Sequence, residues 1–240
     1  MRQHILIAAA FASTALIATP AAASVSLTFE GVNTTYPANN NTQILDFYNG
    51  GLSSVGTSGT NYGISFGSNA LAICLNSTSV TCSNTSKGGL GDPSSAQTGL
   101  FFTSGGATYL NSAAGFDTGF SFNYSSVGSS GSVNVYDGLN GTGNILATLN
   151  LSPNASSCPG FNAGFCPFGP SGVLFSGTAH SIAFGGVANQ IVFDDITFGS
   201  DTPGNSGVPE PSAWAMMLIG FGGVGGAIRR KRRNGVLALA

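Results

Sequence analysis

The sequence predicts an all-β protein, an antiparallel two-sheet β-sandwich of the jelly-roll type. Short runs of alternating apolar and polar residues recur between clusters of Gly, Asn and Ser, and no stretch carries a sustained helical repeat. Charged residues are only 7% of the chain while 42% of it is hydrophobic, so the chain can bury a core. A β-solenoid is the lower-ranked alternative, because no repeat of fixed period is present.

The expected strands are short and are separated by turn residues. In the clearest of them, residues 116–124, Phe and Tyr alternate with Asp, Gly, Ser and Asn, which gives one apolar and one wet face. Residues 137–143 (DGLNGTG) predict a hairpin turn. The other expected strands are residues 25–29, 62–66, 133–136, 145–151, 181–184 and 190–198.

The first 23 residues have the features of a secretory signal peptide. Arg2 and His4 precede an apolar stretch, Pro20 interrupts it, and the small residues Ala21 and Ala23 predict cleavage before Ser24. A transmembrane helix is the alternative, but the apolar run is too short for one. The remaining chain divides into a β-sandwich domain (24–199), a linker (200–207), a sorting segment (208–233) and a tail (234–240).

The sorting segment consists of a Pro-containing motif, an apolar span and a basic cluster. The span from Ala213 to Ile228 has 16 residues, or about 24 Å of helix, which makes a short transmembrane helix. The basic cluster should stay in the cytoplasm and leave the N-terminal body outside. An ordinary tail anchor is the alternative. The motif is Pro209, Glu210 and Pro211, and the cluster is Arg229, Arg230, Lys231, Arg232 and Arg233.

This segment resembles the PEP-CTERM sorting signal of Gram-negative bacteria, and its wording from Trp214 to Gly222 is similar to the variant common in sphingomonad-type bacteria. The resemblance implies an exosortase partner that processes the chain at Pro209–Pro211 after transient anchoring in the inner membrane. It also implies a cell-surface or extracellular location and a connection with exopolysaccharide or biofilm. The tail after Arg233 is longer than the resemblance predicts.

The body between the two terminal segments is acidic and nearly free of cations. Lys87 is its one basic residue, and eight of the nine acidic residues lie between positions 24 and 207. Such a body cannot neutralise a run of phosphates, so nucleic-acid binding is excluded. A buried carboxylate in this body lacks a cationic partner, and calcium is the ion that suits oxygen ligands.

The candidate ligands of a structural calcium are the Thr28 carbonyl, Glu30, Asp194 and Asp195. Asp194 and Asp195 are adjacent in an apolar strand, so their side chains are expected on opposite faces. In the alternative, one of them is exposed and the other caps backbone amides. Residues 28–31 and 193–198 also resemble the first and last strands of galactose-binding and carbohydrate-binding-module jelly rolls, which implies that these strands lie together and hold calcium. Asp137 is expected in a plain hairpin turn, since the acid spacing of an EF-hand is absent.

Four cysteines in an exported chain predict disulfides. Three pairings are possible, and the two matching local spacings favour Cys74 with Cys82 and Cys158 with Cys166. A four-cysteine zinc site is the alternative, but it usually has shorter spacing.

Enzyme chemistry is poorly supported by the sequence. Residues 63–67 match the Gly-x-Ser-x-Gly pattern around Ser65, and His180 is the one histidine of the mature body, but no helix is expected after Ser65. Glycosidase chemistry needs two close carboxylates, and Glu30 is the one Glu before the sorting segment. We expect no enzyme, and we rank a secreted hydrolase last.

The favoured function is therefore a structural or adhesive protein of the cell surface or matrix, with a carbohydrate-binding module for exopolysaccharide as the alternative. Sugar sites usually offer aromatic faces, yet the mature body has no Trp, because Trp214 belongs to the sorting segment. Tyr124 is expected in the core, and Tyr36 and Tyr48 lie near polar loops. The tyrosines that could serve are Tyr36, Tyr48, Tyr62, Tyr109, Tyr124 and Tyr136. The ligand itself is not identified.

Overall fold

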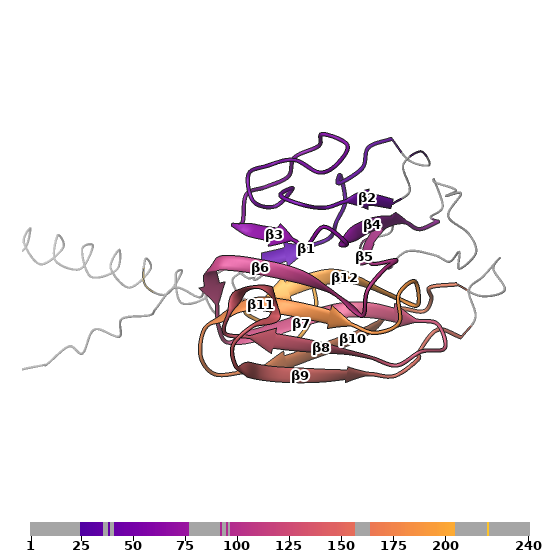
Figure 1. Cartoon of the computed structure of the whole chain (residues 1–240). Helices are drawn as coiled ribbons and strands as arrows, with labels where there is room; N and C mark the ends of the chain where they lie inside the picture. The colour runs from indigo at the N-terminus through magenta and orange to yellow at the C-terminus, as the bar shows by residue number, and fades with distance from the viewer. Residues whose placement is uncertain are drawn as a thin grey trace, which may run out of the picture.

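The computed structural model of the chain describes residues 25–35, 38, 41–76, 92, 95, 97–156, 164–204 and 220. Within this part the chain forms two antiparallel β-sheets, which confirms the predicted sandwich (Figure 1). The expected signal helix, the transmembrane helix, the linker beyond Gly204 and the tail all lie outside the described residues, apart from Gly220. No helix of the described part is long and apolar enough to cross a membrane.

The larger sheet has seven strands, in the order β10-β7-β12-β5-β4-β2, with β1 also paired to β12. The first and last strands of the domain are thus neighbours, with Leu27 opposite Ile196. The strands of this sheet are β1 (Val25–Leu27), β2 (Asn41–Gln43), β4 (Leu71–Cys74), β5 (Thr98–Phe101), β7 (Gly119–Ser126), β10 (Gly169–Leu174) and β12 (Ile191–Phe198).

The smaller sheet has five strands, in the order β3-β6-β11-β8-β9. The predicted hairpin is confirmed, because β8 and β9 pair with Val133 opposite Leu149, and the 3-10 turn η1 (Leu139–Gly141) lies in their connection. The strands of this sheet are β3 (Ile64–Phe66), β6 (Ala107–Phe116), β8 (Gly131–Tyr136), β9 (Ile145–Leu151) and β11 (Ala179–Gly185).

The predicted single strand over residues 116–124 is wrong. Phe116 ends β6 in the smaller sheet, and β7 begins at Gly119 in the larger sheet. Between them Thr118 has φ of 73°, a left-handed conformation that turns the chain from one sheet to the other. The aromatic alternation continues through this corner because residues on both sides of it face the same core.

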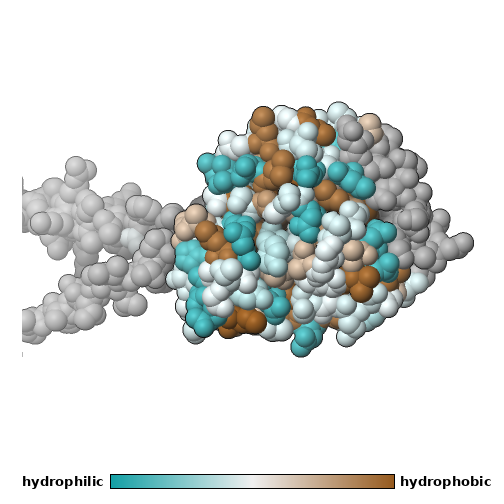
Figure 2. Space-filling model, viewed as in Figure 1, coloured by the Kyte–Doolittle hydropathy of each residue, from teal (hydrophilic) through white to brown (hydrophobic). Residues whose placement is uncertain are grey.

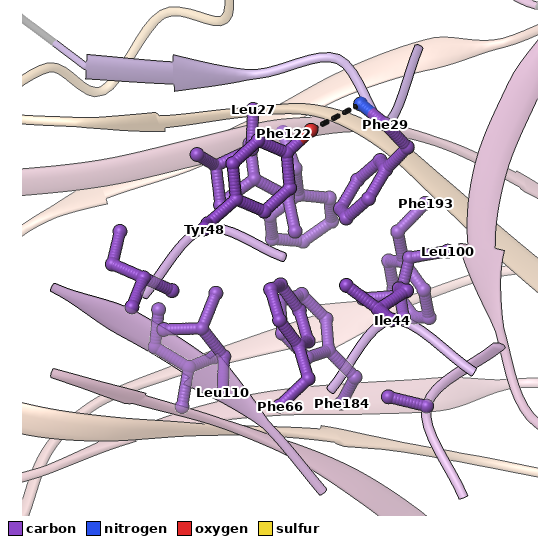
Figure 3. Close-up of a cluster of buried hydrophobic side chains, with 14 of the residues drawn as sticks. Leu27, Phe29, Ile44, Tyr48, Phe66, Leu100, Leu110, Phe122, Phe184 and Phe193 are labelled. Atoms are coloured by element: carbon purple, nitrogen blue, oxygen red, sulfur yellow. Dashed lines mark hydrogen bonds between the residues drawn. The ribbon is translucent and has the colours of Figure 1, made fainter. Parts of the chain in front are cut away.

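The core between the sheets is rich in phenylalanine. Phe184 of β11 and Phe193 of β12 come from different sheets, and their ring centroids lie 4.8 Å apart at 60°. Figure 3 shows such rings directed into one interior. Tyr124 packs against this core as expected, while its hydroxyl donates to the Ser152 carbonyl at 3.2 Å. Edge-to-face aromatic pairs of this kind add about 0.5–1.5 kcal/mol each to the gain from burial.

The outer side of the larger sheet is also covered. Val192 of β12 packs in a second cluster with Ile73, Leu75, Phe101 and Phe165, so every residue of β12 is buried. On the face drawn in Figure 2, by contrast, hydrophobic residues are dispersed among hydrophilic ones. The strand that carries Asp194 and Asp195 is therefore covered on both of its sides.

Candidate functional site

A β-bulge in β12 positions the two adjacent aspartates. Asp194 lies opposite Asn123 of β7, but Thr197 lies opposite Ser121, so β12 has one extra residue over this interval. Asp195 takes up the extra residue with φ of 49°, in the left-handed region. Because of it, the residues that face the main core change from Ile191 and Phe193 before the bulge to Ile196 and Phe198 after it.

Both aspartates are therefore buried. The exposed fraction is 0% for Asp194 and 3% for Asp195, so the alternative with one exposed aspartate is wrong. The expectation of opposite faces assumed a regular strand, and the extra residue removes that regularity. Two adjacent carboxylates now share one buried region of the sheet.

Asp194 is fully buried, and its two carboxylate oxygens have different surroundings. Its Oδ1 accepts the backbone N–H of Asp195 at 2.8 Å, while its Oδ2 is buried and has no hydrogen-bond partner. Burial raises the pKa of Asp194 well above its usual value, and the neighbouring charges of Asp195, Asp92 and Glu30 raise it further. Among the described residues, neither a hydrogen-bond donor nor a cationic side chain is thus paired with Asp194 Oδ2.

Glu30 and Asp195 approach the same region from different segments. Glu30 Oε1 accepts the backbone N–H groups of Gln97 at 3.0 Å and Thr98 at 2.8 Å. Burial raises the pKa of Glu30 in spite of these bonds, and the charge of Asp195 adds to the effect. Asp195 Oδ2 accepts the Asn123 side-chain amide at 3.3 Å. The structure therefore brings the predicted residues Glu30, Asp194 and Asp195 into one electrostatic neighbourhood.

The main chain of Thr28 is linked to a fourth acidic residue. Its carbonyl accepts the Ser95 hydroxyl at 3.0 Å, and the backbone of Ser95 forms an isolated antiparallel β-bridge with Asp92. Asp92 is only 2% exposed and acts on Asp194 as a fourth carboxylate. The sequence offered no signal for Asp92, because it lies in a loop of Gly, Asp, Pro and Ser without strand periodicity. We call Glu30, Asp92, Asp194 and Asp195 the carboxylate cluster.

The oxygen ligands of the carboxylate cluster suit a hard cation, although the side chains are not arranged around one point. The described residues include no Lys or Arg. Calcium takes carboxylate and carbonyl oxygens as ligands, and these are the atoms present here. Within the described ranges, however, no three His, Cys, Asp or Glu side chains are arranged to hold a metal ion. Occupation by calcium would thus require side-chain movement, with Asp194 Oδ2 as the available oxygen.

The cysteines are only partly described. Cys74 ends β4 and Cys166 precedes β10, and both are buried. Neither of them is a free thiol. Cys82 and Cys158 lie outside the described residues, so the predicted pairing stays a prediction.

The hydrolase pattern does not form its elbow. Ser65 is the central residue of β3, paired with Asn111 of β6, whereas the pattern needs a sharp strand-to-helix turn. His180 lies in β11 with Nδ1 3.1 Å from the Ser112 carbonyl. Asp137 accepts the backbone and side-chain N–H groups of Asn144, which lowers its pKa and confirms the plain turn.

Two of the candidate tyrosines lie together. Tyr48 is buried and Tyr62 is 40% exposed, with ring centroids 6.2 Å apart at 28°. Both line a cleft beside Glu30. Tyr36 lies outside the described residues.

The fold and the terminal segment define the chain as an exported β-sandwich protein with a C-terminal sorting signal. The family described as the PEP-CTERM protein-sorting motif matches residues 207–233, which supports sorting by an exosortase and a cell-surface or extracellular location. The comparison with curated proteins found no match.

Proposed function

We propose that this chain is a non-enzymatic structural or adhesive protein of the cell surface or matrix, with a β-sandwich that calcium stabilises. The observation that carries the calcium proposal is Asp194 Oδ2, a buried carboxylate oxygen without a hydrogen-bond partner in the described part of the chain. Burial raises the pKa of Asp194, and the charges of Asp195 and Glu30 raise it further. A bound divalent cation would offset this repulsion, because no cationic side chain occurs among the described residues.

The surface role rests on the sorting signal. Residues 207–233 match a motif that exosortases recognise, so the body is expected to act after export. Association with exopolysaccharide or biofilm is part of the proposal, and it is supported by the resemblance of the signal alone. The absence of an elbow around Ser65 favours this role over hydrolysis.

Thermal unfolding of the purified protein tests the calcium proposal. We expect a higher Tm in millimolar CaCl2 than in EGTA, since a ligand that binds only the folded state stabilises it. The gain should be absent in Asp194→Asn and retained in Asp117→Asn, a change at an exposed turn. Equal Tm values for the unchanged protein in CaCl2 and EGTA would refute the calcium site.

Carbohydrate binding is the second candidate function. It is favoured by one observation, the partly exposed ring of Tyr62 in a cleft that also offers hydroxyl groups. Aromatic faces of this kind can pack against the apolar faces of sugar rings.

A further inference from the structure

A cleft of about 670 Å³ opens between the segment after β1 and the loop that precedes β3. We propose that this cleft binds a neutral sugar unit of a glycan, with Tyr62 as the stacking surface. The assignment rests on the second candidate function and gives it a location and a ligand class. Four features of the cleft lead to it: an aromatic wall, a hydroxyl wall, its charge and its rigidity.

The aromatic wall is backed by buried rings. Tyr62 is 40% exposed, Tyr48 lies 6.2 Å behind it, and Phe47 meets Tyr48 edge-on with centroids 4.8 Å apart. The backbone N–H of Tyr62 also donates to the Tyr48 carbonyl at 2.8 Å. The exposed ring is thus held in place before any ligand arrives, which lowers the entropy cost of binding.

The remaining wall is rich in hydroxyl groups. Thr28, Thr34, Ser58 and Thr60 line the cleft, and the last three of them are exposed. Hydroxyls act as both donors and acceptors, so they suit a ligand that is itself covered with hydroxyls.

The charge of the cleft selects against anions. Among the described residues that line it, Glu30 is the one ionisable group besides the two tyrosines, and none is Lys or Arg. In the calcium-free protein, a phosphate or uronate would meet this carboxylate without a compensating cation. Glu30 can instead accept hydrogen bonds from a neutral sugar, because a carboxylate has several acceptor positions. Its Oε1 accepts two backbone N–H groups, and its Oε2 accepts the Thr98 hydroxyl at 3.5 Å.

The loop that forms the cleft is tied to the opposite wall. Thr57 Oγ1 donates to the Val32 carbonyl and lies 2.7 Å from Ser53 Oγ. The N–H of Gly59 donates to the Phe47 carbonyl at 3.0 Å. These bonds join the residues 53–59 both to the segment after β1 and to the aromatic wall.

Affinity electrophoresis of the purified full chain tests the assignment, in gels that contain dextran, a soluble β-glucan, galactomannan or alginate. We expect retardation by at least one neutral polysaccharide and none by alginate. Tyr62→Ala should weaken the retention about tenfold, which corresponds to about 1.4 kcal/mol. Tyr62→Phe should keep it, because the ring remains. The control Leu174→Ala removes an exposed apolar side chain of β10 and should have no effect.

A second variant, Thr60→Lys, tests the cleft even if Tyr62→Ala does not fold. It places a long cation at an exposed position of the cleft wall and should also weaken retention by the neutral polysaccharide. Unchanged retention of both variants would overturn the cleft assignment while leaving carbohydrate binding in place. Preference for alginate would overturn the ligand class. No retardation in any gel would overturn carbohydrate binding and the cleft together.

Discussion

The backbone N–H of Phe29 donates a 2.9 Å hydrogen bond to the phenolic oxygen of Tyr48, which joins the segment after β1 to a ring that lines the cleft (Figure 3). Phe29 is fully buried and has φ of 59°, so the chain makes a left-handed bend at this point. The bend directs the Phe29 ring into the core and Glu30 toward the cleft.

The first prediction removes this hydrogen bond. Tyr48→Phe keeps the ring but leaves a buried N–H without a partner, and it should lower the free energy of unfolding by about 1–3 kcal/mol. Urea unfolding measures the change. The matched control is Tyr124→Phe, whose hydroxyl bonds the Ser152 carbonyl at an exposed position and should cost less. Equal losses in the two variants would contradict a special role for the bond to Phe29.

The second prediction concerns the packing of the cleft loop. A Cβ added at Gly59 would lie 2.3 Å from the Phe47 ring, so the ring or the loop would have to move. Gly59→Ala should therefore destabilise the protein by about 1–3 kcal/mol. Gly106→Ala is the control, because nothing lies within 4 Å of its added Cβ. Calorimetry compares the Tm values of the two variants. An unchanged Tm for Gly59→Ala would show that the loop is not held against Phe47.

The third prediction concerns the pH dependence of stability without calcium. Burial raises the pKa of Asp194 in the folded state, so between the unfolded and the folded pKa the native protein retains a proton that the unfolded chain has lost. Stability in calcium-free buffer should therefore fall as the pH rises above about 4, the ordinary pKa of Asp. Chemical unfolding from pH 4 to pH 8 measures this slope.

Two comparisons make that pH experiment decisive. Asp194→Asn cannot titrate at this position and should make the slope shallower. Glu30, whose pKa is also raised by burial, should keep part of it. Calcium should reverse it, because the cation binds the ionised form and its contribution is lost on acidification. A calcium-free protein whose stability is the same across the range would show that Asp194 does not control this equilibrium.

Much of the fold was predictable because alternation along a strand is a local property. The period-two patterns predicted the β-class, the β8–β9 hairpin and the last strand. Alternation does not record when the chain changes sheets, so residues 116–124 suggested one strand where Thr118 turns a corner. Likewise, a strand pattern contains no sign of an extra residue, so the bulge at Asp195 was missed.

The candidate site was predictable only in part. Glu30, Asp194 and Asp195 could be selected because carboxylates in a nearly cation-free body need a partner. Asp92 could not, since it reaches them from a distant loop without a motif. The exposure of Tyr62 was equally hidden, because it depends on Tyr48 and on the loop folded beside it.

The sequence by itself determined the sorting signal, the β-sandwich and the shortage of cations, since these depend on residue type and local order. Only the tertiary structure decided that Asp194 is buried beside three other carboxylates and that Tyr62 lines a cleft. Burial and the closeness of charged groups depend on contacts between segments that are far apart in the chain. Glu30 and Asp195 are an example. Strand pairing and the bulge in β12 bring such segments together, and no local pattern of residues encodes that arrangement.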